Sequence, residues 1–537
     1  MAAAGAVAAL LPSIVSWSEE ADPFATAGEI VIAQAPEAVL GISCVVFSQD
    51  MRKVAYLANQ NQGVTPKETV YLGDGHGPLF DFVNCDQQMK EGGLHAFRAG
   101  INSLTFSGDG SSFAYQARNA HENWRLVLDG KEHAGIKDDY HFSPAGGTIA
   151  AANCEGKQGC CWRTGKDVGK PRAEGETCPT LVEFAEDGKA VPVRYEFEGE
   201  KKRIVVGTTV GPWFGEITDF RLDPAGIHHS YVGCAKKDEC VPVLDGKKAG
   251  PAYARILSLL PVHEAGTSIL IARKGASGFV VNASGAEGPT FEYVTPPPVV
   301  DAQGRVFYIA TQGEEKFAIV RQEGAKTLTT KSFPCIHLMR GEPGPKLSAT
   351  YPYAPESPVV MSPDGKRFAF MACCSSCCRP GEGGSCKKAG CLSEGADFEM
   401  KVVVNGSAGS SIDKGSASKC YPPGSIHGFT WSPDGKKYAF ALARGGSSSM
   451  FVGGKVVASR SGETFSDPVF TPDGGKVLFV SWKEKKGGGR KGRVYLGSTP
   501  ISGEYDLVEW PPRLDAGKVA FNAVKGRAFL LVVLEME

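Results

Sequence analysis

Three cysteines of this chain occupy the same place in a repeated sequence pattern, and they are the residues best suited to chemistry. Cys154, Cys234 and Cys373 each lie eight residues after a glycine that closes a short turn. In two of these copies a second cysteine follows at the same offset, Cys160 and Cys240. Facing residues of antiparallel strands lie about 4.5–5.5 Å apart between Cα atoms, a distance that a disulfide can span. The pattern therefore predicts the hairpin disulfides Cys154–Cys160 and Cys234–Cys240.

A denser run of cysteines begins at Cys373 and forms a cysteine-rich insertion over residues 373–420. One interpretation is that Cys373 and its neighbours form several disulfides, because a glycine-rich insertion has no core of its own. A second interpretation is a zinc site with four thiolate ligands, and a third is reduced thiols. Two-cysteine hairpins favour disulfides, since two ligands are too few for zinc, so no cofactor is predicted and zinc stays the alternative. The zinc ligands would be Cys374, Cys377, Cys386 and Cys391.

The turn that precedes these cysteines recurs eleven times along the chain. Its clearest copy is Ser362-Pro-Asp-Gly365, followed by a β-rich stretch that ends at Phe370. Most copies lie about forty residues apart, and a fixed period of that length marks a repeat architecture. The closing positions are Met51, a degenerate copy, and Gly110, Gly146, Gly188, Gly226, Gly266, Gly304, Gly365, Gly435, Gly474 and Gly517.

A single copy shows how much structure each repeat encodes. Pro433 and Gly435 suit the corners of a tight turn, because proline fixes φ and glycine tolerates positive φ. Residues 438–442 alternate between large apolar and small side chains, which is the period of a half-buried strand. A third strand follows, and a fourth is expected before the next copy, as at 253–256 and 291–294. Four-stranded antiparallel sheets of this size must stack to bury their faces, so the sequence predicts an all-β fold of propeller type.

These turns, with the strands that follow them, resemble the TolB-type, tryptophan-aspartate-like repeats of β-propellers. The resemblance is clearest at Ser362-Pro-Asp-Gly365, Ser432-Pro-Asp-Gly435 and Thr471-Pro-Asp-Gly474, and it covers residues 40–537. It implies a propeller fold and usually a binding or scaffolding activity, although the same repeats also occur beside hydrolase domains.

Eleven repeats exceed the four to eight blades of a typical single propeller. We therefore expect tandem propellers, a first over residues 29–290 and a second over 291–537, with the three prolines at 296–298 near the junction. An early strand at 29–32 could complete an open blade and close a ring by pairing the two ends of the chain. The apolar residues 1–28 form either an arm or a degenerate targeting segment.

Composition and motifs argue against nucleic-acid binding and against catalysis. Lys and Arg number 58 and Asp and Glu 59, so no net positive field attracts a polyanion. The Gly-x-Ser-x-Gly elbow, the His-Glu-x-x-His motif and the phosphate loop are all absent, so no catalytic residue is predicted. We expect a non-catalytic scaffold or protein-binding subunit of a larger assembly, whose partners bind the blade loops and insertions. The alternative is a propeller-type enzyme, or a small-ligand or metal binder, with its site in a central channel.

The compartment follows from the cysteines and not from the N-terminus. The first charged residue is Glu19 and the first basic residue is Arg52, so residues 1–28 lack the positive region of a secretory signal. No segment is a convincing membrane span. Hairpin disulfides persist in oxidising surroundings, which favours a secreted, periplasmic or organellar location over the cytosol.

Overall fold

The computed structural model describes the chain from residue 24 to residue 536, with gaps, and its elements in that part are all strands. The predicted N-terminal arm lies almost wholly outside the described part, as does most of the cysteine-rich insertion. The residues that are not described are 1–23, 25–26, 38, 40, 63–64, 85–103, 121, 145, 155–159, 166–167, 169, 171, 174–175, 224, 263–266, 275–277, 284, 302–303, 312–316, 331, 333–334, 338–358, 374–396, 406, 417–424, 486–488, 516 and 537.

The strands form eleven small antiparallel sheets, numbered here in chain order. The first six are sheet 1 with β2(Gly41–Phe47), β3(Val54–Gln62), β4(Thr65–Leu72) and β5(Gly75–Phe80); sheet 2 with β6(Phe82–Val83), β7(Thr105–Phe106), β8(Phe113–Arg118), β9(Arg125–Leu128) and β10(Lys131–His133); sheet 3 with β11(Ile136–Phe142), β12(Ile149–Asn153) and β13(Cys161–Thr164); sheet 4 with β14(Leu181–Phe184), β15(Ala190–Glu198), β16(Lys201–Val206) and β17(Thr209–Val210); sheet 5 with β18(Glu216–Leu222), β19(His229–Lys236), β20(Glu239–Leu244) and β21(Lys247–Lys248); and sheet 6 with β22(Arg255–Val262), β23(Thr267–Arg273), β24(Phe279–Ala283) and β25(Ala286–Glu287).

The remaining five sheets repeat the same antiparallel order. They are sheet 7 with β26(Val294–Val300), β27(Val306–Thr311), β28(Phe317–Glu323) and β29(Lys326–Thr329); sheet 8 with β30(Cys335–His337), β31(Val360–Met361), β32(Phe368–Cys373), β33(Asp397–Val404) and β34(Ser407–Ser416); sheet 9 with β35(Ser425–Trp431), β36(Tyr438–Arg444), β37(Ser447–Val452) and β38(Lys455–Ser461); sheet 10 with β39(Glu463–Phe465), β40(Val469–Phe470), β41(Val477–Glu484), β42(Arg490–Leu496) and β43(Thr499–Pro500); and sheet 11 with β44(Leu507–Val508), β45(Arg513–Asp515), β46(Lys518–Lys525), β47(Ala528–Glu535) and the N-terminal β1(Gly28–Gln34).

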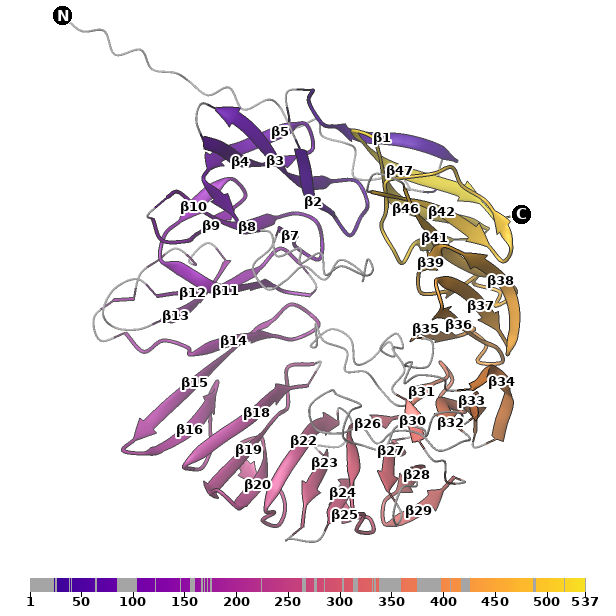
Figure 1. The fold of residues 1–537 in the computed structure, drawn as a ribbon. Helices are drawn as coiled ribbons and strands as arrows, with labels where there is room; N and C mark the ends of the chain where they lie inside the picture. Colours follow the sequence, from indigo (N-terminus) through magenta and orange to yellow (C-terminus); the bar gives the residue numbers. More distant parts are fainter. Residues whose placement is uncertain are drawn as a thin grey trace, which may run out of the picture.

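The eleven sheets follow one another around a ring, as the blades of a propeller do (Figure 1). This confirms the prediction of about eleven antiparallel blades in an all-β fold. The ends of the chain close the ring, because β1 pairs antiparallel with β47 and brings Glu29 opposite Val532. The strand expected at 29–32 is therefore confirmed as the closing strand. Because that closure joins sheet 11 at one end of the chain to the other end, the blades form one ring in place of the two expected from the number of repeats.

The expected boundary at 290/291 falls between sheets 6 and 7, and these sheets pack together as other neighbours do. Ile271, Val294 and Tyr308 belong to a single hydrophobic cluster that spans both sheets. The three prolines at 296–298 lie inside β26, where its register with β27 shifts. Proline has no N–H to give to the ladder, so the prolines interrupt pairing within a strand and do not separate two units.

The fourth strands differ from those expected at 253–256 and 291–294. These segments overlap the starts of β22 and β26, which are the first strands of sheets 6 and 7. Tyr253 and Phe291 form isolated antiparallel bridges to the third strand of the preceding sheet. The fourth strand is a shorter segment, such as the two-residue β21 or β25. The sequence pattern was ambiguous because a buried aromatic residue directly precedes each new first strand.

The repeated turn closes the first hairpin of a sheet and contacts the same turn of the preceding sheet. In sheet 9 the N–H of Gly435 donates to the Ser432 carbonyl at 2.8 Å, and Gly435 has a φ of 66°. The Ser432 hydroxyl donates to Asp434 at 2.6 Å. A Cβ at position 435 would lie 3.3 Å from the Cβ of Ser362, in the equivalent turn of sheet 8. Both the backbone conformation and the close approach of the neighbouring turn therefore require glycine.

Side chains also link one sheet to the turn of the next. Lys53 Nζ, from sheet 1, donates to the Gly110 carbonyl of sheet 2 at 2.8 Å. Asn522 Nδ2, from sheet 11, donates to the Met51 carbonyl of sheet 1 at 3.0 Å. The junction where the chain ends meet thus carries the same kind of link as a junction between consecutive sheets.

The antiparallel order gives the ring two different faces. The repeated turns and the hairpins between third and fourth strands lie on one side, which we name the turn face. The hairpins between second and third strands, and the connections between sheets, lie on the opposite side, which we name the loop face. Strand β32 ends and strand β33 begins at the loop face. Within the described part of the chain, no helix is long and apolar enough to cross a membrane.

Replacing Gly435 by alanine should lower the free energy of unfolding by about 1–2 kcal/mol, because a side chain disfavours positive φ and meets Ser362. The control is Gly41→Ala, since Gly41 starts β2 without a positive φ and with no atom within 4 Å of its missing Cβ. Guanidinium unfolding followed by tryptophan fluorescence measures both. An equal loss of stability in the two variants would contradict the role given to the turn.

Candidate functional site

The two cysteine pairs predicted from spacing are joined in the structure. Cys154 bonds to Cys160, and Cys234 bonds to Cys240, each with Cα atoms 3.9 Å apart. Cys234 and Cys240 face each other in the ladder of β19 and β20, close to the hairpin end. Both pairs lie between the second and third strands of their sheets, and therefore on the loop face. Cys44 is also disulfide-bonded.

A further disulfide, which the sequence analysis did not single out, joins Cys161 to Cys178. It ties the chain before sheet 4 to the edge of β13, where sheet 3 has no fourth strand among the described residues. Arg163 Nη1 and Nη2 donate to the two carboxylate oxygens of Glu176 at 2.6 and 2.7 Å. The N–H of Trp162 donates to the Pro179 carbonyl at 3.3 Å. This segment therefore takes the place of an outer strand, held by a covalent bond and an ion pair.

Metal-ligand atoms gather at the same place, but they are already engaged. The sulfurs of Cys161 and Cys178 and a carboxylate oxygen of Glu176 lie within 4.8 Å of one another. The two sulfurs are bonded to each other. The hydrogen bonds from Arg163 lower the pKa of Glu176 and hold its carboxylate. The arrangement is a tether for the segment and not an open metal site.

The zinc ligands considered in the sequence lie beyond the described residues. These are Cys374, Cys377, Cys386 and Cys391. Cys373 ends β32 at the loop face, and its side chain is likewise not described. The choice between disulfides and zinc in this insertion stays a prediction.

A polar cluster of four side chains, from Tyr253, Lys274, Asn282 and Glu287, lies beside the Cys234–Cys240 disulfide. Tyr253 exchanges two backbone hydrogen bonds with Cys240, at 2.8 and 2.9 Å. Its hydroxyl donates to Glu287 Oε1 at 2.9 Å and accepts a hydrogen bond from Asn282 Nδ2 at 3.1 Å. Lys274 Nζ donates to Glu287 Oε2 at 2.6 Å. Tyr253 lies just before the first strand of sheet 6. Its buried side chain contacts the third and fourth strands of that sheet.

The protonation states in this cluster are fixed by the same contacts. Burial raises the pKa of Tyr253 to about 12, and the nearby Glu287 carboxylate adds to the shift. The hydrogen bond from Lys274 lowers the pKa of Glu287 despite its partial burial. At neutral pH the tyrosine is a neutral hydroxyl and the glutamate is an anion paired with a cation. The cluster is therefore suited to binding through hydrogen bonds and poorly suited to proton abstraction.

A pocket of about 320 Å³ opens at this cluster. Its walls come from the connection between sheets 5 and 6 and from the outer strands of sheet 6. The lining residues are Pro251, Ala252, Tyr253, Lys274, Asn282, Gly285 and Glu287.

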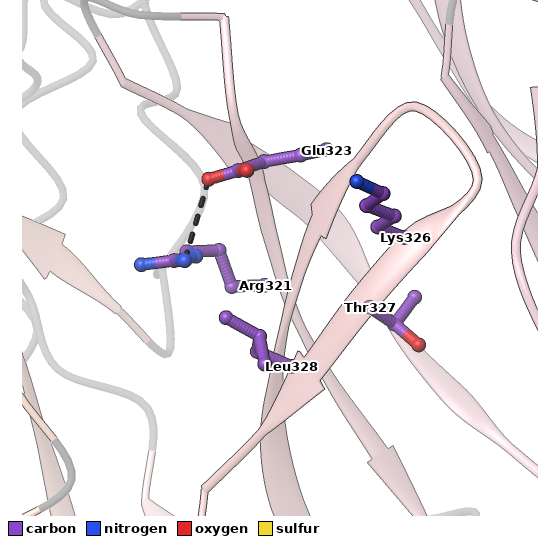
Figure 2. Close-up of a pocket in the computed structure, with 5 residues that line it drawn as sticks. All are labelled: Arg321, Glu323, Lys326, Thr327 and Leu328. Atoms are coloured by element: carbon purple, nitrogen blue, oxygen red, sulfur yellow. Dashed lines mark ion pairs between the residues drawn. The ribbon is translucent and has the colours of Figure 1, made fainter.

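A second pocket of about 320 Å³ lies on the outer strands β28 and β29 of sheet 7 (Figure 2). Arg321 and Glu323 pair there at 3.4 Å, with Lys326 and Thr327 on the adjacent strand. Leu328 is 60% exposed beside them. An ion pair and one exposed apolar side chain give this pocket no evident catalytic arrangement.

The tyrosine, glutamate and lysine of the first pocket recur where the chain ends meet. Tyr505 donates from its hydroxyl to Glu29 Oε1 at 2.9 Å, and Lys525 Nζ lies 3.1 and 3.2 Å from the two Glu29 oxygens. Burial acts to raise the pKa of Glu29, but the hydrogen bonds from Lys525 and Tyr505 outweigh it and leave the pKa below its ordinary value of 4.5. At this second place the three side chains fasten the closing strand β1 to its neighbours.

Comparison with known proteins gives no family for this chain. No protein-family model matches it, and no match was found among the curated proteins. Similar solved structures include the eukaryotic initiation factor, at 12% identity and a TM-score of 0.33 over 77% of this chain and 90% of that one. The β-propeller domain of the Trilobed protease from Pyrococcus furiosus, with an open velcro topology, is 12% identical over 74% of this chain and 96% of that one, with a TM-score of 0.23.

Oligogalacturonate lyase in complex with manganese is 11% identical over 65% of this chain and 96% of that one, with a TM-score of 0.25. Identities and TM-scores this low support no statement about activity. The propeller architecture rests on the strand pairing of the chain itself, and membership of the TolB-type or tryptophan-aspartate-like group stays a prediction.

Trypsin offers a direct test of the Cys234–Cys240 disulfide, because Lys236 and Lys237 lie between the two cysteines. Without reductant, the fragments on either side should stay joined and be detected at one mass. With reductant they should separate. A Cys240→Ser variant, digested without reductant, provides the control that must separate. Free fragments from the unreduced wild-type protein would contradict the disulfide.

The lowered pKa of Glu29 predicts a pH-dependent contribution to stability. A carboxyl group whose pKa is lower in the folded state stabilises the fold above its unfolded pKa and loses that contribution as pH falls through the folded pKa. Glu29→Gln should therefore reduce the melting temperature at pH 7, by on the order of 1 °C because the ion pair is partly exposed. The difference from wild type should shrink below pH 4.5. Glu292→Gln, at an exposed glutamate, is the control and should leave the melting temperature at pH 7 unchanged. A pH-independent effect of Glu29→Gln would contradict the assignment.

Proposed function

We propose that this propeller is a non-catalytic scaffold that binds a protein partner through its loop face. The observation that carries the proposal is the position of the exposed aromatic side chains. Phe82, Phe197 and Tyr293 are 47%, 72% and 44% exposed. Aromatic residues are enriched where proteins bind one another, because they bury much area for little loss of side-chain entropy.

The strand pairing supports the same face for all three residues. Phe82 pairs with Arg118 at the end of β8, and Phe197 pairs with Lys202 at the start of β16. The carbonyl of Tyr293 accepts a hydrogen bond from the N–H of Thr311, which ends β27. Each of these positions lies between a second and a third strand, or where a sheet begins, so each belongs to the loop face. Sheets 2, 4 and 7 thus contribute one exposed ring each.

The disulfides support an oxidising compartment for this function. Three cysteine pairs are joined among the described residues, and such bonds persist mainly in secreted proteins, the periplasm or organellar lumina. The two hairpin disulfides stiffen loops of the face on which the partner would bind. A rigid face loses less conformational entropy on binding than a flexible one.

A triple variant, Phe82→Ser with Phe197→Ser and Tyr293→Ser, should lose its partner. We expect capture of the partner from the native source to fall at least roughly tenfold, because exposed aromatic residues often dominate binding energy. The amounts of captured proteins are compared by quantitative mass spectrometry, and the melting temperature verifies folding.

The matched control changes three exposed aliphatic residues away from the loop face. Ile227 lies next to the repeated turn of sheet 5, while Leu328 and Val456 lie on the outer strands β29 and β38, and their exposed fractions are 70%, 60% and 54%. Their triple serine variant should capture the partner as wild type does. Unchanged capture by the loop-face variant, or a loss confined to the control, would contradict the proposal.

A further inference from the structure

The pocket between sheets 5 and 6 has a counterpart at the ring closure, where Tyr505, Lys525 and Glu29 occupy equivalent positions in the strand pairing. Tyr253 and Tyr505 each form an isolated bridge to the third strand of the preceding sheet, at Cys240 and Gly492. The residue after each tyrosine donates its N–H to the second strand, from Ala254 to Arg273 and from Asp506 to Val524. In both sites a lysine comes directly after the residue that accepts this hydrogen bond: Lys274 follows Arg273, and Lys525 follows Val524.

The outer strands match residue by residue as well. Glu287 faces Asn282 across β25 and β24, and Glu29 faces Val532 across β1 and β47. The tyrosine, glutamate and lysine are therefore common to both sites. Asn282 is the difference, because its counterpart is the fully buried Val532.

The ring-closure site shows which of these side chains are needed to join two sheets. At the ring closure, the tyrosine, glutamate and lysine hold two sheets together with valine at the fourth position. A junction of this kind therefore has no structural need for asparagine. Asn282 is only 5% exposed, and burying an amide in place of an apolar side chain costs about 1–3 kcal/mol unless hydrogen bonds compensate. The hydrogen bond to Tyr253 compensates one N–H of the amide, and a ligand that uses its remaining donor and its oxygen gives a reason for the polar residue.

The amide is also placed where a ligand could reach it. Asn282 lines the pocket of about 320 Å³, and this volume is at the lower end of small-molecule sites. An asparagine side chain has two N–H donors and an acceptor oxygen, and the hydrogen bond to Tyr253 uses one donor. Gly285 has no atom within 4 Å of its missing Cβ, so the wall beside the amide is open.

The charges of the pocket select the class of ligand. Lys274 and Glu287 pair at 2.6 Å and cancel, so neither an anion nor a cation gains a net attraction. The remaining groups are the Tyr253 hydroxyl and the Asn282 amide, which recognise hydroxyl groups. The Lys274 side chain is 58% exposed and can donate to a ligand oxygen while it remains paired.

We propose that this pocket binds a neutral, polyhydroxylated molecule of the size of a monosaccharide. Asn282 and Lys274 donate hydrogen bonds to ligand oxygens, and Glu287 accepts from a ligand hydroxyl. Tyr253 holds Glu287 and Asn282 in place. The site is independent of the protein-binding surface proposed above, since none of the three exposed rings lines it.

The experiment titrates the full, oxidised chain with glucose and with myo-inositol, and with glucuronate and glucosamine as anionic and cationic comparators. Saturation-transfer NMR reports binding and its saturation. We expect at least one neutral probe to bind saturably and more tightly than either charged comparator. Asn282→Val, which reproduces the closure site, should weaken that binding at least roughly tenfold, the change expected when about one hydrogen bond is lost, with the melting temperature unchanged.

Two further variants keep the test decisive. Lys274→Ala changes an exposed side chain, so it should fold and should also weaken binding of the neutral probe. Tyr505→Phe removes the equivalent hydroxyl at the ring closure and should leave that binding unchanged. The proposal is overturned if neither glucose nor myo-inositol binds saturably, if Asn282→Val and Lys274→Ala both bind as wild type does, or if a charged comparator binds more tightly than both neutral probes.

Discussion

Each sheet of this protein has two apolar faces and can bury them only against a neighbouring sheet. In sheet 11, Phe521 and Val532 are fully buried, and they share a cluster with Leu478 of sheet 10 and with Met51 of sheet 1. Burying one large apolar side chain contributes about 1.5–3 kcal/mol, so a sheet with an uncovered face would lose much of its stability. A four-stranded sheet has no other means of covering that face. This constraint makes a continuous ring necessary, and the closure between the chain ends completes that ring.

The closure combines backbone pairing, ring packing and polar contacts. Strand β1 supplies the outer strand of sheet 11 from the opposite end of the sequence. The ring of Phe529 stacks on Tyr56 of sheet 1, with centroids 4.5 Å apart, and packs edge-on against Phe47 at 6.4 Å. Glu29 adds the ion pair with Lys525 and the hydrogen bond from Tyr505. These contacts involve several strands. The junction therefore has the same kinds of contact as junctions between sheets that are consecutive in the sequence.

Local features of this fold and the pairing of the two chain ends could be predicted from the sequence, whereas other contacts between distant residues could not. The turn at Gly435 and the hairpin disulfide of Cys234 involve residues a few positions apart, whose spacing is visible in a single repeat. Cys161 follows Cys160 directly, yet it bonds to Cys178, because the segment before sheet 4 replaces an outer strand. Nothing in the spacing indicates that replacement. The pairing of the chain ends at residues 29–32 was predicted, but the repeats were divided between two rings because eleven exceeds the four to eight blades of a typical propeller.

The polar cluster at Tyr253 carries a signal that a comparison of repeats could have revealed. A buried aromatic residue precedes the first strand in several sheets, as Phe214, Tyr253, Phe291 and Tyr505, and each bridges to the preceding sheet. Only the tyrosines have a hydroxyl that can bind a glutamate on the outer strand. Residues 253–256 were predicted to form a fourth strand, so the special role of Tyr253 was not predicted. Lys274 and Lys525 each lie eight residues after their turn glycines, Gly266 and Gly517, so alignment of the copies on that glycine brings the two lysines into register.

The two faces of the ring differ in how much sequence change they tolerate. On the turn face, neighbouring turns approach so closely that a Cβ at Gly435 would lie 3.3 Å from the next turn, and a Cβ at Gly474 would lie 3.2 Å from Ser432. An inserted residue there would displace the adjoining sheet, and through it the packing of the ring. The loop-face hairpins do not carry these contacts, so the two hairpin disulfides and the insertion between β32 and β33 can be accommodated there without changing how the sheets stack. The requirement for close contact on the turn face therefore favours insertions on the loop face.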